Sequence, residues 1–293
     1  MPVNHVLKGL LAGAAALTLA VAGVTSASAA QPLPVNRGLF SAVGDSFAAG
    51  VGNPALPGAG VSLRSADAYP VLLAGKVNKV TFTAASGATT TDVLTQVANV
   101  PGGARQVTLT VGGNDVGFAR LALACAGGLS TPACVQAQTA AQAGQQALPV
   151  NLAAVLTALR DQAPDAHIYV TGYPLLFQPE VNPLPSCSAL PFYDASAMYA
   201  ADQIVATLNA VIAGVVLGLD PAGAVIEYVD VTGDDAFGGH GLCDGQDSYI
   251  FAPAFYPGTQ IPLPSSLHPT SAGQLAYANA IADVGFVTYA LAG

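Results

Sequence analysis

Short apolar segments alternate with longer segments of helical composition along most of the chain. The apolar segments predict five buried strands, at residues 38–43, 80–84, 106–111, 167–171 and 224–229. The longer segments predict helices at residues 92–100, 136–160 with a break near Pro149, 195–219 and about 272–291. Nearly continuous apolar strands separated by helices are typical of a parallel sheet with both faces covered. The pattern therefore predicts a three-layer α/β/α fold around a central, mainly parallel five-stranded sheet.

Glycine-rich polar motifs follow the first three predicted strands. They are Gly44-Asp45-Ser46, Ser86-Gly87-Ala88 and Gly112-Gly113-Asn114-Asp115. Because ligands of open parallel sheets bind beyond the carboxyl ends of the strands, these motifs are expected on one rim. Acyl transfer requires a nucleophile, a general base and donors to the oxyanion. The motifs supply the nucleophile in the Ser46 hydroxyl, and three donors in the Ser46 amide, the Gly87 amide and the Asn114 side chain. Taken alone, Gly44-Asp45-Ser46 is equally consistent with a simple turn that caps a helix. Motifs like the other two, taken alone, are more often turns than oxyanion donors.

Three of the four histidines are poor candidates for the general base. His5 belongs to the N-terminal segment considered below, and His167 opens a strand at the end opposite to the motifs. His240 lies in a glycine-rich loop beside Cys243, where a structural role is the simpler interpretation.

His268 is the remaining candidate. The following Pro269 disfavours helical geometry at the histidine. The last helix is predicted to begin just beyond it, because Ser271 and Gln274 have the spacing of a capping box. This arrangement places an imidazole on a loop at the rim of the sheet, so His268 is predicted to be the general base.

The first 30 residues have the three-part organisation of a secretory signal. A short basic start ends at Lys8, residues 9–24 are apolar, and residues 25–30 are small, as signal peptidase requires. A membrane anchor is the alternative, but a spanning helix needs about 20 apolar residues. We therefore expect residues 1–30 to be removed and residues 31–293 to form a single secreted catalytic domain.

Composition narrows the classes of partner. Only 9% of residues are charged and the net charge is −9, which argues against a nucleic-acid partner. Apolar residues make up 52% of the chain, yet we expect no segment after residue 30 to be long and uncharged enough to span a membrane. No cofactor is implied by any motif. We expect a monomer.

Four cysteines in an oxidising compartment predict two disulfides, for which three connectivities are possible. Cys125 and Cys134 are close in sequence, with glycine and proline between them, and are predicted to pair. The second pair is then Cys187–Cys243. A zinc site is disfavoured because CxxC spacing and nearby histidines are both lacking, so no metal is expected.

Together the motifs resemble the SGNH hydrolases, also called the GDSL esterase and lipase family. The four blocks of that family are matched in order by Gly44-Asp45-Ser46, residues 86–89, residues 112–115 and His268-Pro269-Thr270. The resemblance implies a flavodoxin-like fold, Ser46 as nucleophile, Gly87 and Asn114 in the oxyanion hole, and His268 as base. Residues 171–174 and 237–243 look like the secreted actinobacterial lipase and phospholipase branch, in which His240 is a loop residue.

One position departs from the family. An acidic residue usually stands three positions before the histidine, and here that position is Ser265. Either a backbone carbonyl, of Ser265 or Ser266, accepts the Nδ1 proton of His268, or a distant Asp replaces the missing acid. Some orienting acceptor is required, because loss of the acid in the serine-protease template costs about 10⁴ in rate. The hypothesis is a Ser46–His268 dyad oriented by a main-chain carbonyl.

Apolar loops suggest the substrate. Residues 249–257 and 261–264 lead toward His268, and residues 175–177 follow the fourth strand on the same rim. Such loops favour an acyl chain, hence a lipid or other hydrophobic ester, with transient contact to a lipid surface. They are equally consistent with loops that only cover the sheet. A carbohydrate- or aryl-ester esterase of this fold, and a secreted binding protein without turnover, remain alternatives. An α/β-hydrolase is disfavoured because no G-x-S-x-G motif occurs.

Overall fold

Five strands form one parallel sheet at the centre of the fold. The computed structural model describes residues 39–74, 80–125, 128–178, 195–259 and 261–286. The strands are β1 (Leu39–Gly44), β2 (Val80–Phe82), β3 (Ala104–Thr110), β4 (His167–Thr171) and β5 (Ile226–Val229), arranged in the order β2-β1-β3-β4-β5. Every neighbouring pair is parallel, which confirms the predicted α/β fold.

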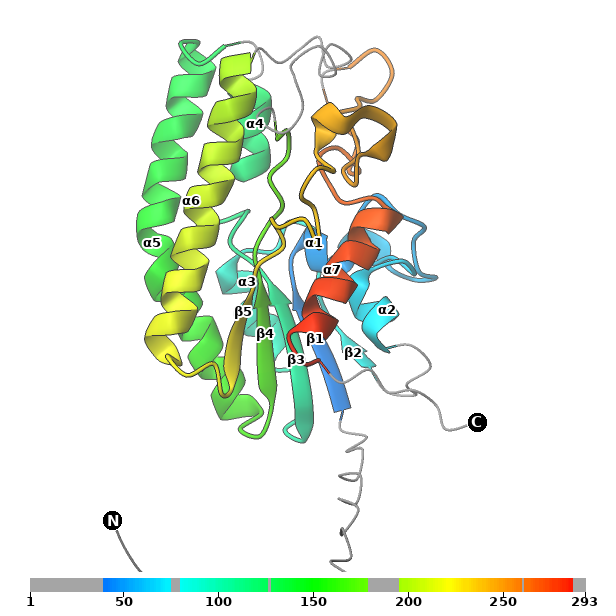
Figure 1. The fold of residues 1–293 in the computed structure, drawn as a ribbon, viewed down its shortest axis with the longest axis vertical. Coiled ribbons are helices and arrows are strands. Elements are labelled where there is room, and N and C mark those ends of the chain that lie inside the picture. The colour runs from blue at the N-terminus through cyan, green and yellow to red at the C-terminus, as the bar shows by residue number, and fades with distance from the viewer. Residues whose placement is uncertain (1–38, 75–79, 126–127, 179–194, 260, 287–293) are drawn as a thin grey trace, which may run out of the picture. The chain divides into compact units, whose positions relative to one another are not determined.

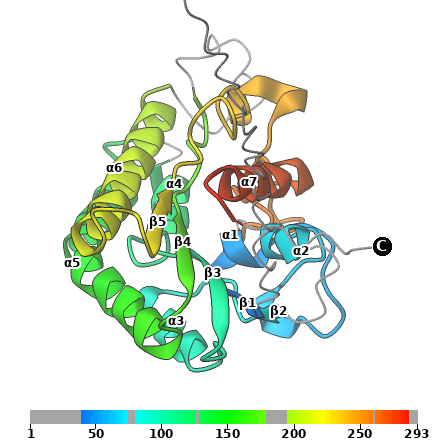
Figure 2. The same ribbon diagram turned by 60° about the horizontal axis from the view of Figure 1, so that its bottom comes forward.

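Helices cover both faces of the sheet (Figures 1 and 2). Helices α3 (Thr90–Val97), α5 (Pro132–Gln162) and α6 (Ala195–Leu219) lie on one face, with α4 (Phe118–Cys125) packed on α5. Helices α2 (Tyr69–Ala74) and α7 (Ser271–Asp283) pack together on the other face. The four-residue α1 (Ser46–Ala49) follows β1 directly, and 3₁₀ turns occupy Gly60–Ser62 and Leu242–Asp247.

The register of the two central strands aligns their carboxyl ends. Gly44, the last residue of β1, pairs with Thr110, the last residue of β3. The motif after β1 and the motif after β3 therefore emerge side by side at one rim, as parallel-sheet topology requires.

Helix α5 buries a regular apolar stripe against the sheet. Its buried leucines and valine recur every three or four positions, as one face of a helix requires: Leu148, Leu152, Val155, Leu156 and Leu159. The predicted break near Pro149 is wrong, because α5 is continuous through that residue. Proline removes one intrahelical hydrogen bond, but the flanking turns are anchored by this stripe.

The capping box predicted for the last helix is also wrong. Thr270, not Ser271, is the N-cap, and its hydroxyl accepts from the Gly273 amide. The Gln274 side chain turns inward instead, where it accepts from the Tyr69 amide and donates to the Phe47 carbonyl. The helix ends at Asp283, earlier than the sequence pattern predicted.

Helix α6 contradicts the expectation that no segment after residue 30 is long and apolar enough to span a membrane. Among the described helices, its Ser196–Leu219 segment is long and apolar enough to cross a membrane by length and composition alone. However, α6 packs against α5 and β5. Its Asp202 carboxylate also accepts hydrogen bonds from the amides of residues 176–178, at 2.7–3.0 Å. These contacts are those of a core helix.

The predictions for the chain termini and cysteines have different outcomes. The structure contains a Cys125–Cys134 disulfide, which joins the end of α4 to the start of α5. Cys187 lies outside the described residues, so the Cys187–Cys243 pair stays a prediction. Residues 1–38 lie outside them as well, and the signal peptide stays a prediction. The described residues all fall within one compact unit, residues 37–293.

Candidate active site

A sharp turn at the end of β1 presents Ser46 to the rim. Gly44 has a φ of 136°, and a Cβ there would lie 2.3 Å from the Thr110 carbonyl oxygen, so only glycine fits. Asp45 then caps α1, accepting from the Phe47 amide at 2.9 Å. Ser46, the first residue of α1, is largely buried and lines a cavity of about 260 Å³.

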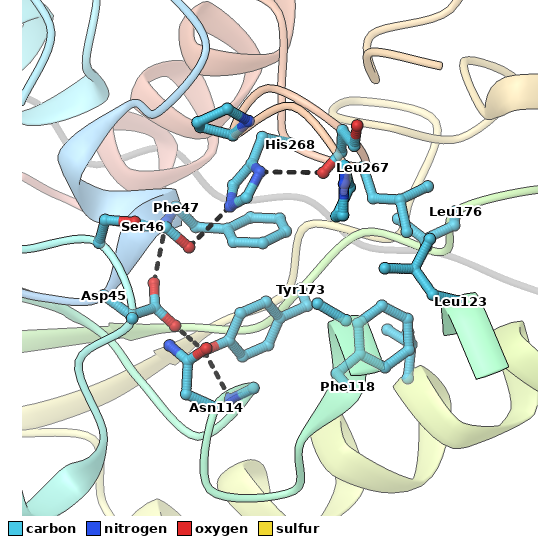
Figure 3. A pocket seen from close by; sticks show the side chains of 18 of the residues that line it. Asp45, Ser46, Phe47, Asn114, Phe118, Leu123, Tyr173, Leu176, Leu267 and His268 are labelled. Carbon is cyan, nitrogen blue, oxygen red and sulfur yellow. Dashed lines mark hydrogen bonds between the residues drawn. The ribbon is translucent and has the colours of Figure 1, made fainter. Parts of the chain in front are cut away.

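His268 meets Ser46 from a loop that is remote in sequence. Its Nε2 lies 2.7 Å from the Ser46 Oγ (Figure 3). Main-chain pairing holds this loop. The Phe251 amide donates to the His268 carbonyl, and Ile250 and Pro269 form an isolated antiparallel β-bridge. Leu267, just before the histidine, adopts a left-handed φ of 63° that non-glycine residues seldom occupy. The surrounding packing therefore fixes the path of the loop.

A main-chain carbonyl orients the imidazole. His268 Nδ1 lies 3.1 Å from the carbonyl oxygen of Ser266. Because a carbonyl only accepts, Nδ1 carries the proton and Nε2 is left to accept from the Ser46 hydroxyl. The Ser265 carbonyl instead accepts from the His268 amide at 3.0 Å. Among the described residues, no carboxylate forms an ion pair with His268.

Burial favours the neutral form of the His268 imidazole. Removal from water lowers the pKa of His268 to about 4, although the carbonyls of Ser266 and Pro264 oppose that shift. A neutral imidazole at neutral pH is the form that can accept a proton.

Three donors converge on the same cavity. Gly87 follows β2 with a φ of 78°, and no atom lies within 4 Å of where its Cβ would be, so the space beside it is open. Asn114 follows β3, and its side-chain nitrogen donates one hydrogen to the Ala88 carbonyl at 2.9 Å. Within the described part of the chain, the amides of Ser46 and Gly87 have no hydrogen-bond acceptor. These N–H groups are thus free to bind an oxygen atom placed in the cavity.

Asp115 connects the two loops that carry Gly87 and Asn114. Its carboxylate accepts from the amide and the hydroxyl of Thr90, at the start of α3. Together with the Asn114–Ala88 hydrogen bond, this fixes one loop against the other.

Four polar residues beneath the nucleophile were not assigned a role in the site from the sequence: Gln96, Gln274, Asp45 and Tyr173. The Gln96 side chain accepts from the Gly44 amide and donates to its carbonyl, at 2.7 and 2.9 Å. Gln274 holds the Phe47 carbonyl, as described above. Asp45 is fully buried and accepts from the Tyr173 hydroxyl (Figure 3). Asp45, Gln274 and the segment that contains Tyr173 all belong to motifs visible in the sequence, but those motifs do not predict these contacts.

Burial dominates the electrostatics of Asp45. It raises the pKa of this carboxyl to about 7, although the hydrogen bonds from Tyr173 and the Phe47 amide act in the opposite direction. The pKa of Tyr173 is raised well above its usual value by burial and by the nearby Asp45.

The cavity continues from the reacting groups into an apolar space. Side chains from α4, α6 and the loops after β4 and before His268 line it: Phe118, Leu123, Val205, Leu208, Leu176, Pro262, Leu263 and Leu267. Of the apolar loops predicted near the site, residues 262–264 and Leu176 line this space. Phe177 is fully buried elsewhere, and residues 249–251 pair with the histidine loop, residues 261–270.

The two other described histidines lie where the sequence suggested. His167 opens β4, at the end away from the site, with its Nε2 3.3 Å from the Glu227 carboxylate. His240 stacks on Tyr249 at 3.8 Å between ring centroids. Neither lines the cavity.

The parallel α/β/α fold and the Ser–His pair at its rim define a hydrolase of the SGNH type. Residues 42–276 match the GDSL-like Lipase/Acylhydrolase family, and the chain belongs to that family. It is 33% identical over 269 residues to Lipase 1 of Streptomyces coelicolor, covering 90% of this chain and 91% of that one.

Two solved structures extend the comparison. Phospholipase A1 from Streptomyces albidoflavus NA297 superposes with a TM-score of 0.71 at 30% identity, covering 84% of this chain and 98% of that one. The extracellular lipase of Streptomyces rimosus superposes with a TM-score of 0.68 at 30% identity, with the same coverage. The protein is thus an acylhydrolase related to lipases.

Proposed function

We propose that this protein is a secreted ester hydrolase in which Ser46 and His268 form a catalytic dyad. His268 Nε2 accepts the Ser46 hydroxyl proton while Oγ attacks the ester carbonyl carbon. The imidazolium then gives that proton to the departing alcohol, leaving an acyl-enzyme. Water, deprotonated by the same imidazole, releases the carboxylic acid and restores Ser46.

The observation that carries this proposal is the distance of 2.7 Å between Ser46 Oγ and His268 Nε2. The opposite ring nitrogen faces the Ser266 carbonyl, which supports the tautomer that a general base requires. In this proposal the carbonyl fulfils the orienting function of the missing acid, although it supplies no charge.

The oxyanion hole consists of the Ser46 amide, the Gly87 amide and the Asn114 side chain. Their available N–H groups at one cavity support this assignment. Removing one donor of this kind typically costs about 10²–10³ in kcat.

We propose hydrophobic acyl esters, including lipids and phospholipids, as substrates. The apolar cavity next to Ser46 supports this choice, since it suits an acyl chain better than a sugar. The similar lipases and the similar phospholipase A1 support it as well.

The outer surface of the histidine loop and of the segment that pairs with it suits transient contact with a lipid surface. Residues 248–270 contain no Asp, Glu, Lys or Arg, and Tyr256 and Ile261 are 45% and 61% exposed. The proposed location is extracellular, supported by the signal-like N-terminus and the extracellular lipase of Streptomyces rimosus. The proposed active form is a monomer.

The dyad can be tested by covalent labelling with a fluorophosphonate. We expect labelling of the wild type, none of Ser46→Ala, and a loss of about 10⁴-fold or more in turnover for both Ser46→Ala and His268→Ala. Failure of the folded wild type to label would instead identify a binding protein without turnover.

A panel of esters then tests the substrate class. Long-chain aliphatic esters, offered dispersed and in phosphatidylcholine vesicles, are compared with acetylated sugars and aryl acetates. We expect kcat/KM to rise with acyl length within the capacity of the cavity. A preference for acetylated sugars would contradict the proposed substrate.

A further inference from the structure

The Tyr173 hydroxyl lies between the two halves of the proposed oxyanion hole. It donates to the Asp45 carboxylate at 2.5 Å and accepts from the Gly113 amide at 3.0 Å (Figure 3). Asp45 immediately precedes Ser46, and Gly113 immediately precedes Asn114. One phenol oxygen therefore contacts the neighbour of each donor.

Tyr173 is itself held at both ends. The Asn209 side chain, from α6, accepts from the Tyr173 amide and donates to its carbonyl, both at 2.8 Å. The ring is 4% exposed and packs edge-on against Phe47, with 5.0 Å between ring centroids. A residue fixed in this way can transmit its position to the groups that its hydroxyl contacts.

The two donors need such a connection because they come from different strands. Ser46 follows β1 and Asn114 follows β3, and the last strand pairing between them is Gly44 with Thr110. Beyond that point, the Tyr173 hydroxyl bridges the two segments. Donors must lie about 2.7–3.1 Å from one oxyanion to act together.

From these contacts we infer that Tyr173 is a positioning residue of the oxyanion hole, setting the separation of the Ser46 amide and the Asn114 side chain. The inference rests on the proposed roles of those two groups. Misplacement of a reacting or stabilising group by about 1 Å can cost 10²-fold in rate. Loss of the hydroxyl should therefore slow turnover without weakening ground-state binding, because the phenyl ring would still line the cavity.

Tyr173→Phe tests this inference, with Tyr277→Phe as the matched control. Tyr277 is also buried, and its hydroxyl donates one hydrogen bond, to the Gly172 carbonyl at 2.9 Å. We expect Tyr173→Phe to lower kcat about 10- to 100-fold with KM within about threefold, and Tyr277→Phe to change both by less than threefold. The assay uses a soluble p-nitrophenyl ester. Titration with a fluorophosphonate gives the concentration of active sites by which kcat is calculated.

A second readout separates positioning from general loosening of the fold. An alkylboronic acid forms a tetrahedral adduct with the serine and places an oxygen among the donors, as the transition state does. Its affinity should fall in Tyr173→Phe by about the same factor as kcat/KM, and should not change in Tyr277→Phe. If Tyr173→Phe does not fold, Asn209→Ala, which frees the Tyr173 main chain, is expected to cause a smaller loss of kcat and boronate affinity.

Two results would overturn the inference. One is wild-type kcat in Tyr173→Phe, and the other is an equal loss of kcat in the tyrosine variant and its control. Neither would affect the proposed dyad, which depends on labelling of the wild type at Ser46.

Discussion

The two segments that meet at the site are held in different ways. The nucleophile turn, residues 44–47, is short and buried, and side chains from α3, α7 and the segment after β4 hydrogen-bond it from below. The histidine loop, residues 261–270, is partly exposed and held mainly by main-chain pairing with residues 249–256. The serine, in a sharp turn, is thus supported by polar side chains, whereas the position of the histidine depends on the path of the backbone.

This difference extends to the electrostatics. Beneath the nucleophile lies a carboxyl whose pKa burial raises to about 7, whereas the histidine loop supplies only a carbonyl to the imidazole, whose pKa burial lowers to about 4. Among the described residues next to the Ser46–His268 pair, a carboxyl group therefore lies on the serine side and none is paired with the imidazole. The predictions below test how far the two segments differ, beginning with the largest expected effect.

The first prediction concerns the pH dependence of stability. Between pH 4 and 6.5, Asp45 is protonated when folded and ionised when unfolded, so it lowers stability as the pH rises. His268 is neutral when folded and protonated when unfolded over the same range, so it raises stability as the pH rises. The two effects oppose each other in the wild type, and between pH 6.5 and 7 only that of Asp45 remains.

Single variants should uncover each effect in urea unfolding across this pH range. Asp45→Asn is expected to gain stability from pH 4 to 6.5, relative to the wild type, by up to about 1.4 kcal/mol per pH unit. His268→Gln is expected to lose stability with rising pH relative to the wild type. Parallel profiles for all three proteins would contradict both shifts.

The second prediction compares one supporting side chain from each segment. Gln96→Met removes the partner of the buried Gly44 amide and should lower the free energy of unfolding by about 2 kcal/mol. Ser266→Ala removes a hydroxyl that hydrogen-bonds the amide and carbonyl of Ala254, which is partly exposed. Its cost should be about 1 kcal/mol or less. Equal costs would show that the two segments are supported alike.

The third prediction concerns the missing acid and has the smallest effect. Ser265→Asp restores a carboxylate three positions before His268. Because the Ser265 side chain faces Gly52, and the Ser266 carbonyl already binds Nδ1, kcat should change by less than about threefold. Steady-state kinetics at pH 7 measure it, with Ser265→Asn as the uncharged control. A tenfold gain with Asp but not with Asn would show that the dyad lacks a charge it can use.

The sequence was sufficient for much of this protein. Strand segments of continuous apolar residues predicted the parallel sheet, and the polar motifs after the first three strands predicted which residues reach its rim. His268 could be chosen by elimination, because His167 opens a strand at the opposite end and His240 lies in a glycine-rich loop beside Cys243, where a structural role is the simpler interpretation. Local chemistry decides all of these features, so they are visible along the chain.

Helix limits and caps were less predictable. Pro149 and Gln274 each carried a valid local signal, for a break and for a capping box, but tertiary contacts overrode both. The stripe of α5 stabilises the turns on either side of the proline, and Gln274 gains two buried main-chain partners that no capping box could offer.

What only the tertiary structure decided is how the site is held. The sequence left open whether the Ser265 carbonyl, the Ser266 carbonyl or a distant Asp faces His268, and it assigned no function to the Tyr173 hydroxyl. The contacts of the Tyr173 hydroxyl join residues up to 128 positions apart, from Asp45 after β1 to Tyr173 after β4, and these two strands are separated by β3 in the sheet. Residue types and motif order follow from the chain alone, whereas hydrogen-bond partners across strands depend on the register and packing of the folded sheet.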